Sequence, residues 1–327
     1  MKVFIAGGTG VIGRQLVPRL VAEGYIVTAI SRSDAGVGWL RDQGALAELC
    51  DVFDAARLQR LVAQCRPDAV MHQMTDISPN MHPRRVGEDM STTNRLRTEG
   101  TRLLANAATS SGARRFIVQS IAFLYAPDHP SPASERTPLY REAPAAYRPM
   151  VDAVTQCEEV TLGTAGIEGT VLRYGYFYGA GTIYARDGTF ANGVMQRRIP
   201  LVGDGAGVYS FIHVSDAAAA TVAALQADAG IYNVVDDEPA AVREWLPCYA
   251  SVLGARPPVR IPALIGRMAG GSYLTYLMNR QIGASNLLAK SHLGWRPRYA
   301  SWREGFKSEF ASSDDIARVD KPSGVKA

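Results

Sequence analysis

The residues best suited to hold a ligand stand near the start of the chain, in the run Ala6-Gly7-Gly8-Thr9-Gly10-Val11-Ile12-Gly13. This run follows an apolar strand-like segment and opens an amphipathic helical one. In such a turn Gly7 allows the tight bend, Gly10 lets backbone approach a pyrophosphate, and Gly13 lets helix and strand pack closely. The helix start adds free N–H groups and a positive dipole end. The spacing therefore predicts a dinucleotide-binding loop that also uses Thr9, Val11 and Ile12.

The residues after the second expected strand bear on which dinucleotide is bound. They are Ser31, Arg32 and Ser33, and a guanidinium between two hydroxyls suits the 2′-phosphate of NADP. In the competing interpretation Arg32 is a solvated surface charge and Asp34 bonds the ribose of NAD. The sequence favours NADP(H) and leaves NAD(H) open.

Short β-rich runs alternate with helical stretches along the first half of the chain. We expect strands at Lys2 to Ala6, Tyr25 to Ile30, Ala69 to Met71, Arg115 to Gln119 and Thr170 to Arg173. Helical segments should begin near Val11, Ala55, Thr93 and Val151. This alternation predicts an α/β fold, a Rossmann-type doubly wound parallel sheet covered by helices on both faces.

After Arg173 the alternation gives way to a Gly/Tyr-rich segment and a tail interrupted by Pro and Gly. We expect residues 1–175 to form the NADP(H)-binding domain and residues 176–327 a smaller substrate-binding lobe. A segment near residues 208–235, with Ser210 to Val214 as its strand, should return to the main sheet. Ser215 or Asp216 is the expected cap of the alanine-rich helix that follows.

Composition narrows the class of protein. The 327 residues are 47% apolar and 20% charged, and the net charge of +4 comes from scattered arginines, which does not favour nucleic-acid binding. The four cysteines are far apart and lack metal-ligand spacing, so we expect free thiols, no metal site and a reducing cytoplasm. No stretch is long and apolar enough to span a membrane, and no signal segment leads the first strand.

Motifs over most of the chain resemble those of the extended short-chain dehydrogenases/reductases, the NAD-dependent epimerase/dehydratase family. They are GGTGVIG, Asp51-Val52, Asp68-Ala69-Val70-Met71-His72, Glu99-Gly100-Thr101-Arg102-Leu103-Leu104, Arg115-Phe116-Ile117-Val118-Gln119-Ser120, Leu172-Arg173-Tyr174, Phe211-Ile212-His213-Val214-Ser215-Asp216 and Leu293-Gly294-Trp295-Arg296-Pro297. The resemblance implies a nicotinamide cofactor, with adenine contacts at Asp51 and Val52 and further cofactor contacts at Gln73, Met74 and Tyr174. Homodimers built from the helices near Thr93 and Val151 are common in that family.

The residues expected to transfer protons depart from the family pattern. Its Tyr-x-x-x-Lys pair uses the ammonium to lower the pKa of the phenol, yet this chain has no lysine between Lys2 and Lys290. Tyr147 stands at the place of the tyrosine, and Val151 at that of the lysine. Ser120 lies one residue before the usual serine, which turns its side chain toward the other face of an extended strand. We take Ser120, Tyr147 and Tyr125 as the catalytic candidates.

The fifth-strand bend and the substrate side depart from the family as well. The resemblance implies Thr-Asp-Glu at this bend for a sugar 4,6-dehydratase, whereas this chain has Ile121-Ala122-Phe123. No general acid or base is present in that triplet, so elimination of water is not expected. Tyr209 and Tyr176 replace the arginine and asparagine that sugar-nucleotide members place near a diphosphate. Together with Phe177 and Tyr178, they predict a pocket that stacks on an apolar or aromatic molecule.

Three functions are compatible with these residues. The first is an NADP(H)-dependent oxidoreductase or isomerase acting on a small carbonyl or alcohol substrate of apolar or aromatic character, with unusual proton transfer. The second, motivated by the missing lysine, is a redox-inactive sensor that holds the dinucleotide without turnover. The third is non-redox cyclisation or isomerisation in a pocket that keeps the fold.

Overall fold

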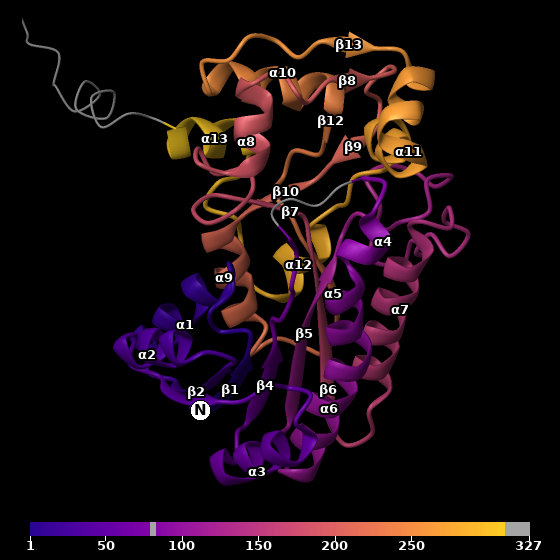
Figure 1. Ribbon diagram of the computed structural model, residues 1–327. Coiled ribbons are helices and arrows are strands. Elements are labelled where there is room, and N and C mark those ends of the chain that lie inside the picture. Colours follow the sequence, from indigo (N-terminus) through magenta and orange to yellow (C-terminus); the bar gives the residue numbers. More distant parts are fainter. Residues whose placement is uncertain (79–82, 311–327) are drawn as a thin grey trace, which may run out of the picture.

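The fold is built on a seven-stranded parallel sheet (Figure 1). The structure is a computed structural model that describes residues 1–78 and 83–310. In spatial order the strands are β11 (Gly230–Val234), β6 (Glu168–Tyr174), β5 (Arg115–Ile121), β4 (Ala69–His72), β1 (Lys2–Ala6), β2 (Ile26–Ser31) and β3 (Leu46–Leu49). All five expected strands are present, and β3 and β11 are the edge strands that the sequence analysis missed. The expected doubly wound sheet is confirmed.

Helices cover both faces of the sheet. One face carries α1 (Gly13–Ala22), α2 (Asp34–Asp42), α9 (Val214–Ala223) and α12 (Leu287–His292). The other carries α3 (Ala55–Cys65), α6 (Thr101–Ser110) and α7 (Arg148–Gly163). Side chains of a strand alternate between faces, so Val3 and Ile5 of β1 pack with the first set while Phe4 packs with the second. The chain reverses its direction of growth between β1 and β4, which is where open α/β sheets bind ligands.

The crossover from β4 to β5 is less regular than the others. It contains α4 (Val86–Asp89), α5 (Ser91–Arg95) and the π-helical segment η1 (Leu96–Gly100), which runs directly into α6. The η1 segment packs against α7. Single π-helical turns inside α-helices are rare and are frequently found at functional sites.

The C-terminal lobe lies beyond one end of the sheet (Figure 1). Its helices are α8 (Thr189–Met195), α10 (Val242–Val252), α11 (Ala263–Asn279) and α13 (Trp302–Phe310). Its strands form three pairs, β7 (Tyr176–Tyr178) with β10 (Phe211–His213), β9 (Val208–Tyr209) with β12 (Ala240–Ala241), and β8 (Leu201–Val202) with β13 (Arg260–Ile261). An aromatic core holds the lobe together, with Trp245, Phe211, Tyr249, Trp302 and Phe306 among its buried members.

Two local expectations were wrong. The segment Ser210 to Val214 does not join the main sheet, because Phe211–His213 pairs with β7. The part of residues 208–235 that does return to the main sheet is Gly230–Val234. Neither Ser215 nor Asp216 caps α9 with its side chain. The ring of His213 accepts the backbone N–H of Ser215, and the Asp216 carboxylate accepts N–H groups from Arg298 and Tyr299. No helix in the described part of the chain is long and apolar enough to cross a membrane.

Candidate functional site

The glycine turn between β1 and α1 is formed by close backbone contacts. Gly7 has φ +100°, and a Cβ there would lie 2.4 Å from the carbonyl carbon of Gln73. A Cβ on Gly13 would lie 2.4 Å from the oxygen of Gly7, so the third glycine is required for packing of α1 onto the turn. No side chain caps α1. Its N-terminus is therefore available to an anion, as expected for a pyrophosphate site.

A cavity of about 140 Å³ opens beside this turn. It is lined by Leu96 of η1 and by residues at or just after the ends of β1, β2, β3 and β4, namely Gly7, Thr9, Gly10, Ile30, Ser31, Arg32, Cys50, Asp51, Val52, Phe53, Gln73, Met74 and Thr75. Both polar atoms of the Gln73 amide are buried without a hydrogen-bond partner. Buried amides are normally bonded, so this cavity suits a polar ligand. The residues present fit a dinucleotide cofactor.

The three residues expected at the 2′-phosphate, Ser31, Arg32 and Ser33, have different contacts in the structure. Ser33 is the N-cap of α2 and accepts the N–H of Gly36, while Ser31 is buried and accepts the N–H of Ser33. The guanidinium of Arg32 is 61% exposed and lies 3.7 Å from Asp76, a long contact between two exposed groups. Arg32 is therefore the member of the three that is free to meet a ligand. Asp34 is the first residue of α2 and does not line the cavity.

The other expected cofactor residues fall into two groups. Asp51, Val52, Gln73 and Met74 line the cavity, as the resemblance implied. Val11, Ile12 and Gly13 do not line it and lie at the start of α1. Tyr174 is the exception, because its hydroxyl is 2.6 Å from that of Thr221 in the core beneath α9. The Tyr174 hydroxyl also interacts with the side chain of Gln73, which lines the cavity, so Tyr174 lies behind the cavity wall and its role in cofactor binding stays a prediction.

Tyr147 is buried at the N-terminus of α7, and its hydroxyl donates to the carbonyl of Phe123 at 3.2 Å. Burial, with neighbouring Tyr273 and Tyr276, raises the pKa of Tyr147 well above its usual range. Val151, one turn further along, is fully buried. A phenol with so high a pKa is a poor proton donor. Because it stays neutral at pH 7, it cannot act as a base either.

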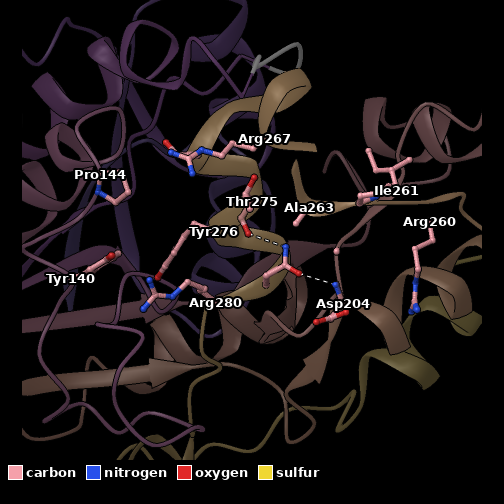
Figure 2. Close-up of a pocket in the computed structure, with 14 residues that line it drawn as sticks. Tyr140, Pro144, Asp204, Arg260, Ile261, Ala263, Arg267, Thr275, Tyr276 and Arg280 are labelled. Carbon is pink, nitrogen blue, oxygen red and sulfur yellow. Dashed lines mark hydrogen bonds between the residues drawn. The ribbon is translucent and has the colours of Figure 1, made fainter. Parts of the chain in front are cut away.

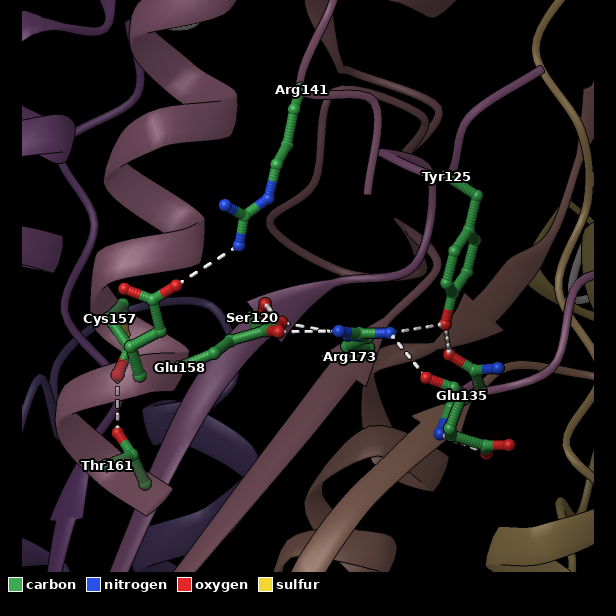
Figure 3. A network of polar contacts seen from close by, with 10 residues as sticks. Ser120, Tyr125, Glu135, Arg141, Cys157, Glu158, Thr161 and Arg173 are labelled. Carbon is green, nitrogen blue, oxygen red and sulfur yellow. Dashed lines mark hydrogen bonds and ion pairs between the residues drawn. The ribbon is translucent and has the colours of Figure 1, made fainter. Parts of the chain in front are cut away.

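Ser120 and Tyr125 belong to a buried ionic network that joins β5, β6, β11 and α7 (Figure 3). Arg173 forms a two-pronged ion pair with Glu158, at 2.8 and 2.5 Å. Ser120 donates to the same carboxylate at 2.6 Å, and the Tyr125 hydroxyl accepts from Arg173 and donates to Asn233. Both hydroxyls are therefore committed to the fold, and the geometry does not support the catalytic roles predicted for them.

The cations near the expected site also differ from the family pattern. Lys290 does not reach the cofactor cavity, because its ammonium lies 2.9 Å from the carboxylate of Asp237. Arg97, in η1, is 3% exposed, and its Nε and Nη1 atoms have no hydrogen-bond partner. Its charge acts on both Tyr147 and Tyr273.

The sequence analysis missed Arg97, although a signal was present. Arg97 precedes Thr101, Leu104 and Ala108 at helical spacing, and those three belong to the buried face of α6. A charged residue in line with a buried stripe is uncommon unless it is paired or functional. Burial lowers the pKa of the Arg97 guanidinium to about 10, so the group stays charged at neutral pH.

Two of the four expected substrate residues form an aromatic stack. Tyr176 lies between Phe123 and Tyr209, with ring centroids 4.2 Å apart on each side. Tyr147, Tyr209 and Tyr273 lie within electrostatic reach of Tyr176, so the stack adjoins the buried phenol of α7. Phe177 and Tyr178 are elsewhere. Phe177 packs on Tyr174 in the sheet core, and Tyr178 packs on Phe211 and Phe306 in the lobe, which does not support substrate roles for them.

A larger cavity, of about 800 Å³, lies between α11 and the loop before α7 (Figure 2). Tyr140, Arg260, Arg267, Tyr276 and Arg280 are among the residues that line it. Tyr276 connects this cavity to the catalytic region, because its ring packs against Tyr147 and its hydroxyl donates to the carbonyl of Tyr125. The helix α11 therefore covers the place where the carboxyl ends of the strands meet the lobe.

Metal ligands and disulfides contribute nothing to this geometry. Within residues 1–78 and 83–310 no group of three or more His, Cys, Asp or Glu side chains is placed to hold a metal ion. The four cysteines are free thiols. His72 is buried, and burial lowers its pKa to about 4, so it is neutral at pH 7.

Comparison with known proteins agrees with this architecture. The model of the NAD dependent epimerase/dehydratase family matches residues 3–235. A 3-diazoavenalumate denitrifying reductase from a Streptomyces species is 42% identical over 311 residues, covering 94% of this chain and 100% of the relative. UDP-glucose 4-epimerase from Thermotoga maritima superposes with a TM-score of 0.75 at 22% identity, covering 98% of this chain and 100% of the other. A dTDP-glucose 4,6-dehydratase from Streptomyces venezuelae gives 0.74 at 20% identity, covering 95% and 96%.

The structural likeness shows the fold, and the sequence matches show descent. The family model covers residues 3–235, which include the glycine turn. This chain belongs to the NAD-dependent epimerase/dehydratase family.

Proposed function

We propose that this chain is an NADPH-dependent reductase of a small aromatic substrate, and that its substrates include aromatic diazo compounds. The proposal depends on one observation. The cavity suits a dinucleotide cofactor, yet the residues expected to donate a proton beside it are not available to do so. Tyr147 is buried with a raised pKa, Val151 stands at the lysine position, and Ser120 is bound to Glu158. Reduction of a ketone needs a proton at oxygen, which this geometry does not favour.

Reduction of a diazo group has a different proton requirement. The cofactor, when bound, supplies a hydride. An aryl diazonium that accepted a hydride at its terminal nitrogen would become an aryl diazene, which would lose N₂ as its hydrogen passes to the ring carbon. The sum is aryl diazonium plus hydride giving arene plus N₂, which balances with no external proton. The relative that is 42% identical carries the name of a denitrifying reductase of a diazo acid, which supports the same chemistry.

The residues of this chain have defined parts in that reaction. The turn at Gly7 and Gly10 holds the pyrophosphate, and Arg32 favours the 2′-phosphate of NADPH. Both faces of Tyr176 are covered by Phe123 and Tyr209, and Tyr209 is buried, so the outer face of Phe123 is where an aromatic substrate would extend the stack. Tyr209 and Tyr176 replace the arginine and asparagine that would contact a diphosphate, which disfavours sugar nucleotides as substrates.

The proposal is tested by following nicotinamide absorbance with three substrate types. The panel contains the diazonium of 3-amino-4-hydroxybenzoic acid, 4-hydroxyacetophenone as the matched ketone, and UDP-glucose, each with NADPH and with NADH. We expect oxidation of NADPH with the diazonium, release of N₂ and formation of 4-hydroxybenzoate by mass spectrometry. Turnover of UDP-glucose without turnover of either aromatic compound would contradict the proposal. Reduction of the ketone alone would restrict the function to carbonyl substrates.

A further inference from the structure

We propose that Arg97 binds an anionic oxygen of the substrate and supplies the cation that α7 lacks. This inference rests on the proposed function, since it names the substrate class of the same site as an aromatic acid or phenolate. It concerns a residue that no motif of the family pattern marked.

The first argument is the state of the Arg97 side chain. The residue is 3% exposed, yet Nε and Nη1 have no partner within hydrogen-bond distance. Leaving charged donors buried and unbonded is unfavourable, because the group has lost its water and has gained no partner in return. Proteins tolerate such a group where a ligand completes it.

The second argument is position. The ionisable side chains within electrostatic reach of Arg97 are Cys157, Tyr147 and Tyr273, and η1 packs against α7. Tyr147 and Cys157 both belong to the α7 region, and the segment between them contains Val151 and Val154, which are fully buried. The guanidinium from η1 therefore faces the part of α7 where the family pattern has its lysine. In this chain the cation is therefore on η1, beside α7, and not on α7 itself.

The third argument is charge balance. None of the three groups near Arg97 is an anion at neutral pH, because burial raises the pKa of Cys157 to about 11 and raises those of Tyr147 and Tyr273 as well. A ribose hydroxyl would accept a hydrogen bond but would leave the positive charge uncompensated. A phenolate or carboxylate oxygen would compensate it and form charge-assisted hydrogen bonds to the two free donors.

The neighbouring aromatic stack fits the same ligand. Tyr176 is within electrostatic reach of Tyr147 and Tyr273, the two phenols that adjoin Arg97. A planar ring lying against the stack can thus extend its oxyanion toward η1. An anionic aromatic compound can both stack on the aromatic rings and pair with the charge of Arg97. A neutral aromatic compound can only stack.

The test measures binding rather than turnover. Isothermal titration calorimetry is carried out on the NADP⁺-loaded protein with 4-hydroxycinnamate, its methyl ester and 4-methoxycinnamate. For the wild type we expect one of the two methylated analogues to bind at least about 10-fold more weakly than 4-hydroxycinnamate, which identifies the carboxylate or the phenolic oxygen as the ligand of Arg97. Equal binding of all three compounds would overturn the proposal.

Variants then assign the effect to the residue. We expect Arg97→Met to weaken 4-hydroxycinnamate binding about 10- to 100-fold and to leave the weaker analogue nearly unchanged, with NADP⁺ affinity within about twofold. The control is Arg102→Met, an exposed arginine on α6, which should change neither affinity. Loss of NADP⁺ affinity with unchanged binding of the aromatic anion would show that Arg97 serves the cofactor and would overturn the proposal.

Two further variants separate a binding role from a folding role. Arg97→Lys keeps the charge and should retain most of the affinity, and Arg97→Met combined with Val151→Lys should recover part of what Arg97→Met loses. If Arg97→Met does not fold, the Arg97→Lys variant and the wild-type comparison of acid with ester still decide the matter. Binding that depends on Arg97 in a protein that does not reduce the diazonium would keep this inference and reject the proposed reaction.

Discussion

The two halves of the site are built from different parts of the chain. Around the glycine turn, the ligand surface is backbone, and glycine is required because a Cβ at Gly7 or Gly13 would lie only 2.4 Å from neighbouring backbone atoms. Around the N-terminus of α7, the chemistry depends on side chains, and there the expected pair is replaced by Tyr147 and Val151, with Arg97 opposite. A backbone site persists because any sequence that keeps the turn keeps the site. A side-chain site can change chemistry without changing the fold.

The buried network beside α7 gives the largest predicted effect. Replacement of Glu158 by Gln should lower the free energy of unfolding by about 3–5 kcal/mol, because it leaves the charge of Arg173 uncompensated in the core. Urea denaturation followed by circular dichroism measures this. The adjacent Glu159, exposed and paired with Arg141, provides the control, and Glu159→Gln should change stability by less than about 1 kcal/mol. Equal effects of the two variants would refute a structural role for the network.

On the backbone side, Gly7→Ala should abolish most cofactor binding. The new Cβ would meet the backbone of Gln73, and the φ of +100° adds about 1–3 kcal/mol of strain. We expect the dissociation constant for NADP⁺ to rise at least about 100-fold, equal to about 2.7 kcal/mol. Gly38→Ala in α2 is the matched control, since nothing lies within 4 Å of its Cβ position. Full affinity in Gly7→Ala would show that the turn is not the cofactor site.

His72 joins the two halves and should make stability pH-dependent. Its Nδ1 accepts the N–H of Met74 and its Nε2 donates to the carbonyl of Leu96, next to Arg97. Burial lowers its pKa from 6.5 to about 4, so the contribution is complete above pH 6.5 and is lost as the pH falls toward 4. The loss should reach about 3 kcal/mol. Denaturation at a series of pH values should show a shallower decline for His72→Gln than for the wild type, and parallel curves would count against this assignment.

Arg32 tests which cofactor the backbone site receives. Arg32→Ala should weaken NADP⁺ binding about 10- to 100-fold, because a charged hydrogen bond to the 2′-phosphate is lost, and should leave NAD⁺ binding nearly unchanged. Calorimetry with both nucleotides checks this, with Arg60→Ala, an exposed residue of α3, as the control. A preference for NAD⁺ in the wild type would contradict the assignment of NADPH.

The same contrast explains what the sequence could and could not predict. The parallel sheet, the glycine turn and the cavity residues Asp51, Gln73 and Met74 follow from local patterns and from the family resemblance. The sequence analysis missed the edge strands β3 and β11. Only one of the four residues of β3 is buried, so this segment lacks the apolar run that marks a central strand. The expected strand Ser210 to Val214 was misplaced because an apolar run does not reveal its partner.

The side-chain roles were harder to predict for a physical reason. A hydroxyl at the right place in the chain can be committed to a core partner, as Ser120 is to Glu158 and Tyr174 is to Thr221. Those partners are 38 and 47 residues away, so spacing alone cannot find them. The contribution of Arg97 depends on η1 packing against α7, which is also a contact between distant segments.

The central claim is that the cofactor is held at the glycine turn while reduction proceeds without the hydroxyls of Ser120 and Tyr147. The most direct test is the single-turnover rate of NADPH oxidation by the diazonium of 3-amino-4-hydroxybenzoic acid in a variant that combines Ser120→Ala with Tyr147→Phe. We predict a rate within about fivefold of the wild type, compared with the roughly 10²- to 10⁴-fold loss that removal of a general acid causes. A loss of that size, with NADPH affinity intact, would contradict the account.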